Sequence, residues 1–381
     1  MNHQHIGRRL KVIREAEGLT QDAMAAIMGL NDRQSVSQIE IGERRVSAAE
    51  ILKVVGRFKV ALDDLTNPFL LAGNDSFSWR QNHVQAEDLD SFEKRAGEWI
   101  GAYRELSRMS EVRLRKLLPR VGLTHTSAFE DAALAGEDIS EELKLGDVPA
   151  HSLARVMEEE LGILILMVDA TSGISGAACR LPELNAVIIN RNEPEARRNS
   201  DLAHEFFHLL TWDAMKPARI ESSVDTWEEP RTKSQRRNQR IEQLADNFAS
   251  GLLMPTKTLD RIGEPKGDLV DWLTAAAETI GVSSRALKWR LVNANRHPAV
   301  GKVSGAALAA AARCRTAGPV PELFGKSFVT TIAKAIEGGH LSGGRAASLL
   351  GQTKAHAGDL CASYGIARPV ELGAQQDPER M

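Results

Sequence analysis

The chain has 381 residues, with 48 basic and 51 acidic side chains, 43% hydrophobic residues and three cysteines. This length predicts two or three domains, and the net charge of -3 argues against a protein coated in basic residues for nucleic acid, without excluding a small DNA-binding domain. The longest apolar run, residues 161–168, is too short to span a membrane, and the first residues lack an apolar signal core. Three widely spaced cysteines argue against a disulfide framework or a thiol-based zinc site. We expect a cytoplasmic protein with no membrane partner.

Residues 1–68 are expected to form a small helical domain. Helical periodicity is dense up to Asn67, which precedes a proline and is therefore pushed out of the helical region. One helix ends near Gly18, a second follows the N-cap Thr20, and a third follows the N-cap Asp32. The apolar residues that can close a core are Leu10, Ile13, Leu19, Met24, Ile27, Val36, Ile39, Ile51 and Val54. This order indicates a helix-turn-helix, although any small helical bundle has similar spacings.

The third of these helices carries polar side chains that suit base edges in the major groove of DNA. The start of the second helix and the segment after the third are placed to contact phosphates. The expected DNA contacts are Gln21, Arg33, Gln34, Ser35, Ser37, Gln38, Arg44 and Arg45.

Two short motifs in this region resemble the XRE family of lambda-repressor-like and Cro-like regulators. They are Gly-Leu-Thr-Gln at residues 18–21 and Ser-Gln-Ile-Glu-x-Gly at residues 37–42. The turn at residues 29–32 is slightly longer than is usual in that family, which alters the register of the base contacts. The resemblance implies a five-helix domain that binds double-stranded operator DNA, commonly as a homodimer on paired half-sites.

Residues 69–144 are expected to be a linker followed by an amphipathic helical segment. The stretch 69–88 is polar and irregular by composition, so we expect it to be exposed. Apolar residues at spacings of three and four between Phe92 and Leu106 predict a long helix or a helix pair over 89–118. Its apolar stripe either packs on the rest of the chain or forms a dimerisation seam.

The next region, residues 145–295, combines short strands with helices, and residues 296–381 are helical by pattern. Apolar runs bounded by turn residues predict the strands. Helices are expected at 150–160, 194–212 and 241–253, and strands at 163–168, 176–181 and 185–190. The segment 318–325 reads as a joint within the C-terminal helical region.

An HExxH pattern lies in the expected helix 194–212. His204 and His208 are just over one helical turn apart, so both imidazoles emerge on one side and can bind one ion. Glu205 is then close enough to act as a general base. On the next helix Glu242 can supply a third ligand, and Asp246 can accept the free ring N–H of a ligating histidine. Two histidines on an ordinary surface or core face are the alternative.

Residues 145–295 resemble the ImmA/IrrE family of zinc metallopeptidases. The resemblance rests on residues 189–210 around HExxH, on residues 242–255 and on residues 282–291. It implies that His204, His208 and Glu242 bind Zn2+ and that Glu205 is the catalytic base. Phe207 stands where that family often has glycine. Residues 323–351 are similar to the tail of long members that also carry an XRE domain.

The predicted fold class is therefore α+β, mostly α. A five-helix lambda-repressor-like domain is followed by a zincin-like metallopeptidase domain with a small sheet, and then by a C-terminal helical region. The sequence leaves two interpretations open for the basic segment 231–240 and two for Cys179. The basic segment 231–240 is a solvated face or a polyanion-sensing element that binds single-stranded DNA as an activating signal. Cys179 is a small buried side chain or a thiolate that occupies the metal in a resting state.

The leading functional hypothesis is a transcriptional regulator with a zinc-dependent endopeptidase domain. It cleaves a repressor, either a partner or itself, in response to a stress signal such as DNA damage. The strand 185–190 would pair with an extended substrate, and residues 69–88 would be the self-cleavage target. One alternative is a DNA-binding repressor whose zinc fold is a non-catalytic sensor or dimerisation scaffold. Another is an antitoxin-like partner that binds no metal.

Overall fold

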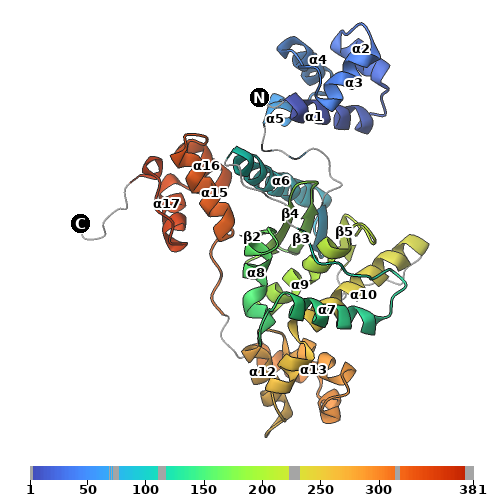
Figure 1. The fold of residues 1–381 in the computed structure, drawn as a ribbon, viewed down its shortest axis with the longest axis vertical. Helices are drawn as coiled ribbons and strands as arrows, with labels where there is room; N and C mark the ends of the chain where they lie inside the picture. Colours follow the sequence, from blue (N-terminus) through green and yellow to red (C-terminus); the bar gives the residue numbers. More distant parts are fainter. Residues whose placement is uncertain are drawn as a thin grey trace.

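The computed structural model describes residues 3–67, 69, 71, 77–109, 117–222, 232–313 and 318–373. Most of these residues are helical, and a single five-stranded sheet lies in the middle of the described chain (Figure 1). This mostly helical α+β architecture confirms the predicted fold class. None of the described helices combines the length and the apolar character that a membrane crossing requires.

The first five helices form a unit with a core of its own, at one end of the molecule in Figure 1. Their bounds are α1 His3–Ala16, α2 Gln21–Met28, α3 Arg33–Ile41, α4 Ala48–Phe58 and α5 Leu62–Thr66. The two predicted N-caps are confirmed: Thr20 Oγ1 accepts a hydrogen bond from the backbone N–H of Ala23 at 3.2 Å, and Asp32 Oδ1 accepts one from Ser35 at 2.7 Å.

The central sheet is mixed and has the strand order β2-β4-β3-β1-β5. Its strands are β1 Phe77–Gln81, β2 Leu164–Val168, β3 Ile174–Arg180, β4 Asn185–Asn190 and β5 Ile220–Ser222. Strands β2 and β4 are parallel, as are β1 and β5, whereas β3 runs antiparallel to both of its neighbours. Within this order, β2 and β5 are the edge strands.

One face of the sheet packs against α6 Ala86–Met109 and three C-terminal helices. These are α15 Lys326–Glu337, α16 Gly343–Leu350 and α17 Lys354–Ser363. Trp99 of α6 contacts Phe324 edge-on, with ring centroids 5.2 Å apart, and both side chains are buried. The apolar stripe of the predicted amphipathic helix therefore packs on the rest of the chain rather than forming a free seam. Residues 110–116, which the prediction also included, lie outside the described residues.

The other face carries the remaining helices, including the one with the HExxH motif. They are α7 Phe129–Glu142, α8 Pro149–Glu159, α9 Glu195–Thr211, α10 Lys233–Leu253, α11 Thr256–Arg261, α12 Leu269–Thr279, α13 Ser284–Asn293 and α14 Gly305–Arg313. Helices α7 and α10 pack closely because Gly136 and Gly251 face the partner backbone: a Cβ at Gly251 would lie 1.9 Å from the carbonyl oxygen of Ala133. The predicted elements at 150–160, 163–168, 185–190 and 194–212 are confirmed to within a residue or two.

Three expectations were wrong. Residues 77–81, expected within an irregular stretch, form β1, in which Phe77 and Trp79 are buried on one face while Ser78 and Arg80 point to the other. Helix α10 begins at Lys233 rather than near 241, because Thr232 and Gln235 form a capping box. Strand β4 cannot pair with a substrate, because β2 and β3 occupy both of its edges.

The expected self-cleavage segment 69–88 is also affected by the strand at its centre. Trp79 is 0% exposed, and its backbone N–H is bonded to the carbonyl of Arg219 at 2.8 Å. A strand that is paired on both sides is inaccessible to a peptidase unless the sheet opens. The neighbouring residues 72–76 lie outside the described residues.

Candidate metal centre

Helix α9 holds the two motif histidines against the sheet. The turn spacing predicted from HExxH places His204 Nε2 and His208 Nε2 3.1 Å apart. Both side chains are buried, with 1% and 0% of their surface exposed. The helix keeps them in place because Leu202, Ala203 and Phe206 pack into the core beside them.

Helix α10 contributes the expected carboxylates. Glu242 Oε2 lies 3.1 Å from His204 Nε2 and 3.6 Å from His208 Nε2. One turn further along, Asp246 Oδ1 lies 2.8 Å from His204 Nδ1, where it can accept the N–H of that ring. The structure thus brings together the residues that the sequence singled out, with Glu242 on the metal-facing nitrogen and Asp246 on the opposite nitrogen.

A fourth residue, Glu221 of β5, was missed from the sequence. Its Oε2 lies 3.4 Å from His204 Nε2, and its Oε1 lies 3.3 Å from His208 Nε2. Ser78 Oγ on the neighbouring strand β1 donates a hydrogen bond to Glu221 Oε1. The carboxylate is 2% exposed and therefore belongs to the interior of the centre.

These four side chains fit a single ion. Their ligating atoms all lie within 4.8 Å of one another. Four donors placed tetrahedrally at about 2.0–2.2 Å from zinc would be separated by about 3.3 Å. The separations among His204, His208 and Glu242 are 3.1, 3.1 and 3.6 Å, close to this value, and each Glu221 oxygen lies 3.3–3.4 Å from one of the two imidazoles. Two imidazoles and two carboxylates are also a donor set that zinc accepts.

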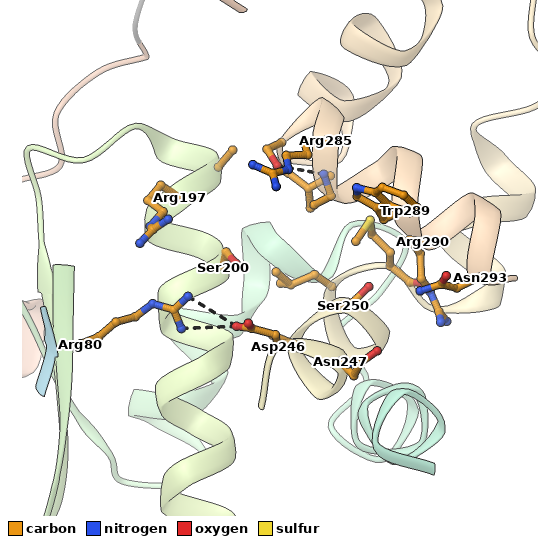
Figure 2. A pocket seen from close by; sticks show the side chains of 17 residues that line it. Arg80, Arg197, Ser200, Asp246, Asn247, Ser250, Arg285, Trp289, Arg290 and Asn293 are labelled. Carbon is orange, nitrogen blue, oxygen red and sulfur yellow. Dashed lines mark hydrogen bonds and ion pairs between the residues drawn. The ribbon is translucent and has the colours of Figure 1, made fainter. Parts of the chain in front are cut away.

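A chain of ion pairs supports the centre from behind. Arg80 of β1 contacts Asp246 Oδ1 at 3.4 Å (Figure 2). Arg80 also contacts Asp201 Oδ1 at 3.2 Å, and Arg197 pairs with the other oxygen of Asp201 at 3.0 Å. Burial alone would raise the pKa of Asp246, but the Arg80 charge and the His204 contact lower it to about 2. Asp246 is therefore ionised and orients the ring of His204.

Glu205 faces the centre without a hydrogen-bond partner for either carboxylate oxygen among the described residues. It is 0% exposed, and burial followed by the nearby Glu221 carboxylate raises its pKa well above the usual value. Gly176 of β3 lies across from it, since a Cβ at Gly176 would be 3.8 Å from Glu205 Cγ. A carboxyl group that lies beside the ligands and bonds to no described side chain is placed for the role of a general base, and a bound cation would favour its ionised form.

Cys179 and the two tyrosines lie away from the metal centre. Cys179 belongs to the cluster on the opposite face of the sheet, and burial raises its pKa far above the ordinary thiol value. It is therefore a buried core side chain and cannot reach the metal as a thiolate. Tyr103 and Tyr364 also pack against that cluster, and Tyr364 Oη donates to the carbonyl of Phe324 at 2.8 Å. Neither tyrosine is placed to stabilise an oxyanion at the centre.

In the N-terminal unit, the predicted DNA contacts have different surroundings. Arg33, Gln34 and Arg45 are exposed. Gln21 instead donates to Glu40 Oε2 at 3.0 Å, and Arg44 donates to Glu50 at 2.8 Å. The serines at 35 and 37 and Gln38 are partly buried. The roles of these residues in DNA binding stay predictions.

Comparison with known families finds one match in the N-terminal helical unit and one in the region of the metal centre. Residues 10–65 match the model of the helix-turn-helix family, and residues 158–292 match the model of the IrrE N-terminal-like domain, a peptidase family. The chain joins a helix-turn-helix domain to an IrrE-like domain. All four candidate ligands and Glu205 fall inside the second match. A search of curated proteins found no match to the chain.

The IrrE-like match is narrower than the fold around it. The match begins after β1, α6 and α7, although β1 supplies Ser78 and Arg80 to the centre.

The basic segment at the start of α10 precedes Glu242 on the same helix, and Arg236 and Arg237 are exposed there. It is therefore a solvated helix face that is continuous with a candidate ligand; Arg231 lies outside the described residues.

Proposed function

We propose that the chain is a DNA-binding transcriptional regulator whose IrrE-like domain is a zinc-dependent endopeptidase that cleaves a repressor. The observation that supports this most strongly is Glu205, whose buried carboxyl group faces four converging metal ligands and bonds to no described residue. A purely structural metal site gains nothing from such a group, which is costly to bury.

Zinc bound by His204, His208 and Glu242 would polarise the scissile carbonyl and activate a water molecule. Glu205 is the residue that would accept the proton of the attacking water and pass it to the leaving amine. Asp246 keeps the Nδ1 proton on His204, so that Nε2 faces the metal.

A zinc ion held by His204, His208 and Glu242 would have Glu221 as a fourth protein ligand. Structural zinc sites have four protein ligands, whereas catalytic sites keep one position open. A peptide substrate therefore reaches the centre only after Glu221 withdraws. Strand β5, which carries Glu221, is an edge strand of the sheet because it pairs with β1 on one side only. An extended substrate would take the place that β5 now occupies, or would pair along β5.

A second function is favoured by the same closure. Four protein ligands and almost complete burial are typical of a structural metal site, so the IrrE-like domain can instead be a non-catalytic sensor or dimerisation scaffold. On that hypothesis Glu205 can be replaced by glutamine without loss of function, and no variant of Glu221 cleaves protein.

The regulatory details are part of this proposal. The helix-turn-helix domain would bind double-stranded operator DNA as a homodimer, and a stress signal such as DNA damage would switch on cleavage. The exposed basic turns of α10 are continuous with Glu242, so single-stranded DNA bound there is the activating signal that we favour. The cleaved repressor is this chain or a partner.

The test is incubation of the zinc-loaded chain, with and without single-stranded DNA, alone and with candidate repressors. Fragments are identified by mass spectrometry, and zinc is quantified in parallel. Specific fragments that are absent in Glu205→Gln, while zinc content is unchanged, support the proposal. Stoichiometric zinc with no cleavage under any condition supports the scaffold. Absence of stoichiometric zinc at neutral pH overturns both.

A further inference from the structure

A pocket of 340 Å³ lies behind the metal centre, between α9, α10 and α13. This volume is within the range of small-molecule sites, roughly 300–1,000 Å³. Figure 2 shows Arg197 and Ser200 on one wall, Asp246, Asn247 and Ser250 below, and the α13 side chains opposite. Arg80 reaches into it from β1. The pocket reaches the Nδ1 side of His204 through Asp246, and no candidate metal ligand lines it.

Helical spacing explains why these side chains meet. Arg285, Trp289 and Asn293 are four residues apart along α13 and therefore share one face of that helix. Ser200 lies about one turn before His204 on α9, and Asp246 lies about one turn after Glu242 on α10. The small residues Ala196 and Ala249 leave the space between the walls open.

The pocket wall carries four arginines and one acidic residue. Three of the arginines have structural roles: Arg80 and Arg197 pair with buried carboxylates, and Arg290 pairs with Glu137. Arg285 is exposed and has no ion-pair or hydrogen-bond partner among the described residues. Side-chain hydroxyl and amide groups from Ser200, Ser250 and Asn247 add neutral donors to the wall. This surface is suited to bind an anion.

Trp289 adds a second kind of recognition. Trp289 lines the pocket and is 51% exposed, whereas Leu287 and Leu291 on the other face of the same helix are fully buried. The Lys288 ammonium covers one face of the indole, with Nζ 4.9 Å from the ring centroid, so a planar ligand ring would stack on the other face. Leu253, Met254 and Val282 provide apolar contacts deeper in the wall.

We propose that this pocket binds a small organic anion with a planar ring, of the nucleoside monophosphate class, and that binding tightens the metal centre. The anionic group contacts Arg285 and Arg197, and the ring stacks on Trp289. An anion beside Arg197 and Arg80 competes with Asp201 and Asp246 for the two guanidinium groups. Asp246 then interacts less with Arg80 and accepts a stronger hydrogen bond from the ring N–H of His204. The stronger hydrogen bond makes His204 a better zinc ligand. This inference does not depend on peptidase activity.

The binding test is calorimetric titration of the zinc-loaded full chain with the four common ribonucleoside monophosphates. Two further probes each carry half of the ligand: adenosine has the planar ring without the phosphate, and inorganic phosphate has the charge without the ring. At least one monophosphate is expected to bind at least about tenfold more tightly than either half-probe. Arg285→Glu and Trp289→Ala should each weaken it about tenfold or more, whereas Arg313→Glu, an exposed charge reversal on α14, should not. No saturable binding below about 1 mM, or binding unchanged in both pocket variants, overturns the proposal.

The coupling test uses the zinc dissociation constant, measured by chelator competition with and without the bound monophosphate. We expect the zinc dissociation constant to fall when the monophosphate is bound. By linkage, the monophosphate should bind more tightly to the zinc-loaded chain than to the zinc-free chain by the same factor. Arg285→Glu controls for chelation of zinc by the nucleotide itself, because there the nucleotide should leave the zinc constant unchanged. An equal effect of the nucleotide in both proteins overturns the coupling.

Discussion

Asp246 Oδ1 lies 2.8 Å from His204 Nδ1 and also receives the guanidinium of Arg80 at 3.4 Å. One carboxylate thus connects a candidate metal ligand on α9 to a buried arginine on β1. The centre is therefore set by residues from three elements that are remote in sequence, and the orientation of His204 depends on all of them.

Asp246→Asn is expected to weaken zinc binding by roughly 10–100-fold, because the amide is a poorer acceptor for the His204 N–H and leaves Arg80 with one carboxylate fewer. Chelator competition measures this change. Asn247→Ala, on the next position of α10, is the matched control and should have little effect. Equal zinc affinity in wild type and Asp246→Asn would show that the contact does not orient the ligand.

Glu221→Ala is expected to lower zinc affinity by more than about tenfold, because it removes a charged donor from the interior of the centre. Glu242→Ala should have an effect at least as large. Arg219→Ala is the control for disturbance of β5 that removes no metal ligand, and it should leave zinc affinity nearly unchanged. Arg219 precedes β5 and pairs with Glu93 of α6 at 3.2 Å. Unchanged zinc affinity in Glu221→Ala would mean that its carboxylate is not a ligand.

Gly251→Ala is expected to destabilise the IrrE-like region by about 1–3 kcal/mol, because the new Cβ would meet the α7 backbone and force the two helices apart. Thermal unfolding followed by circular dichroism measures the loss. Gly56→Ala, in a helix where nothing lies within 4 Å of the new Cβ, should be neutral or stabilising. Equal unfolding temperatures for Gly251→Ala and wild type would contradict this close packing.

Glu158 should make stability depend on pH. Burial raises its pKa to about 7, and contacts with Ser327 and the backbone of Ile165 only partly oppose the rise. The unfolded chain loses this proton near pH 4.5 and the folded chain near pH 7, so stability is full below pH 4.5 and falls as pH rises through this window, by about 3 kcal/mol at most. Glu158→Gln should remove that fall, which unfolding curves between pH 4 and pH 8 would reveal. Parallel pH profiles for the two proteins would count against it.

Local patterns were sufficient for much of the fold and for part of the site. His204 and His208 follow from helical spacing alone, and the N-caps Thr20 and Asp32 from the chemistry of helix starts. Glu242 was reachable because its helix has its own amphipathic pattern. The two family matches agree with the resemblances read from the motifs.

Glu221 could not be found in this way, for a physical reason. Strand β5 has three residues and no apolar run, and it exists only because it pairs with β1. Strand β1 was itself hidden, since Ser78 and Arg80 face the metal centre and give it a polar composition. A short strand whose polar side chains serve a site resembles a loop in sequence. Several acidic residues lie between the HExxH helix and the Glu242 helix, among them Asp213 and Asp225, and nothing in the sequence distinguishes Glu221 from them.

The most direct measurement compares proteolysis by four zinc-loaded proteins: wild type, Glu221→Ala, Glu205→Gln and the double variant. Fragments of the chain and of added candidate repressors are identified by mass spectrometry, at zinc concentrations that saturate each protein. We expect little cleavage by wild type without its signal, specific cleavage by Glu221→Ala, and none by either protein that lacks Glu205. Glu221→Ala that holds zinc yet cleaves nothing, or cleavage that persists without Glu205, would contradict a peptidase held closed by Glu221.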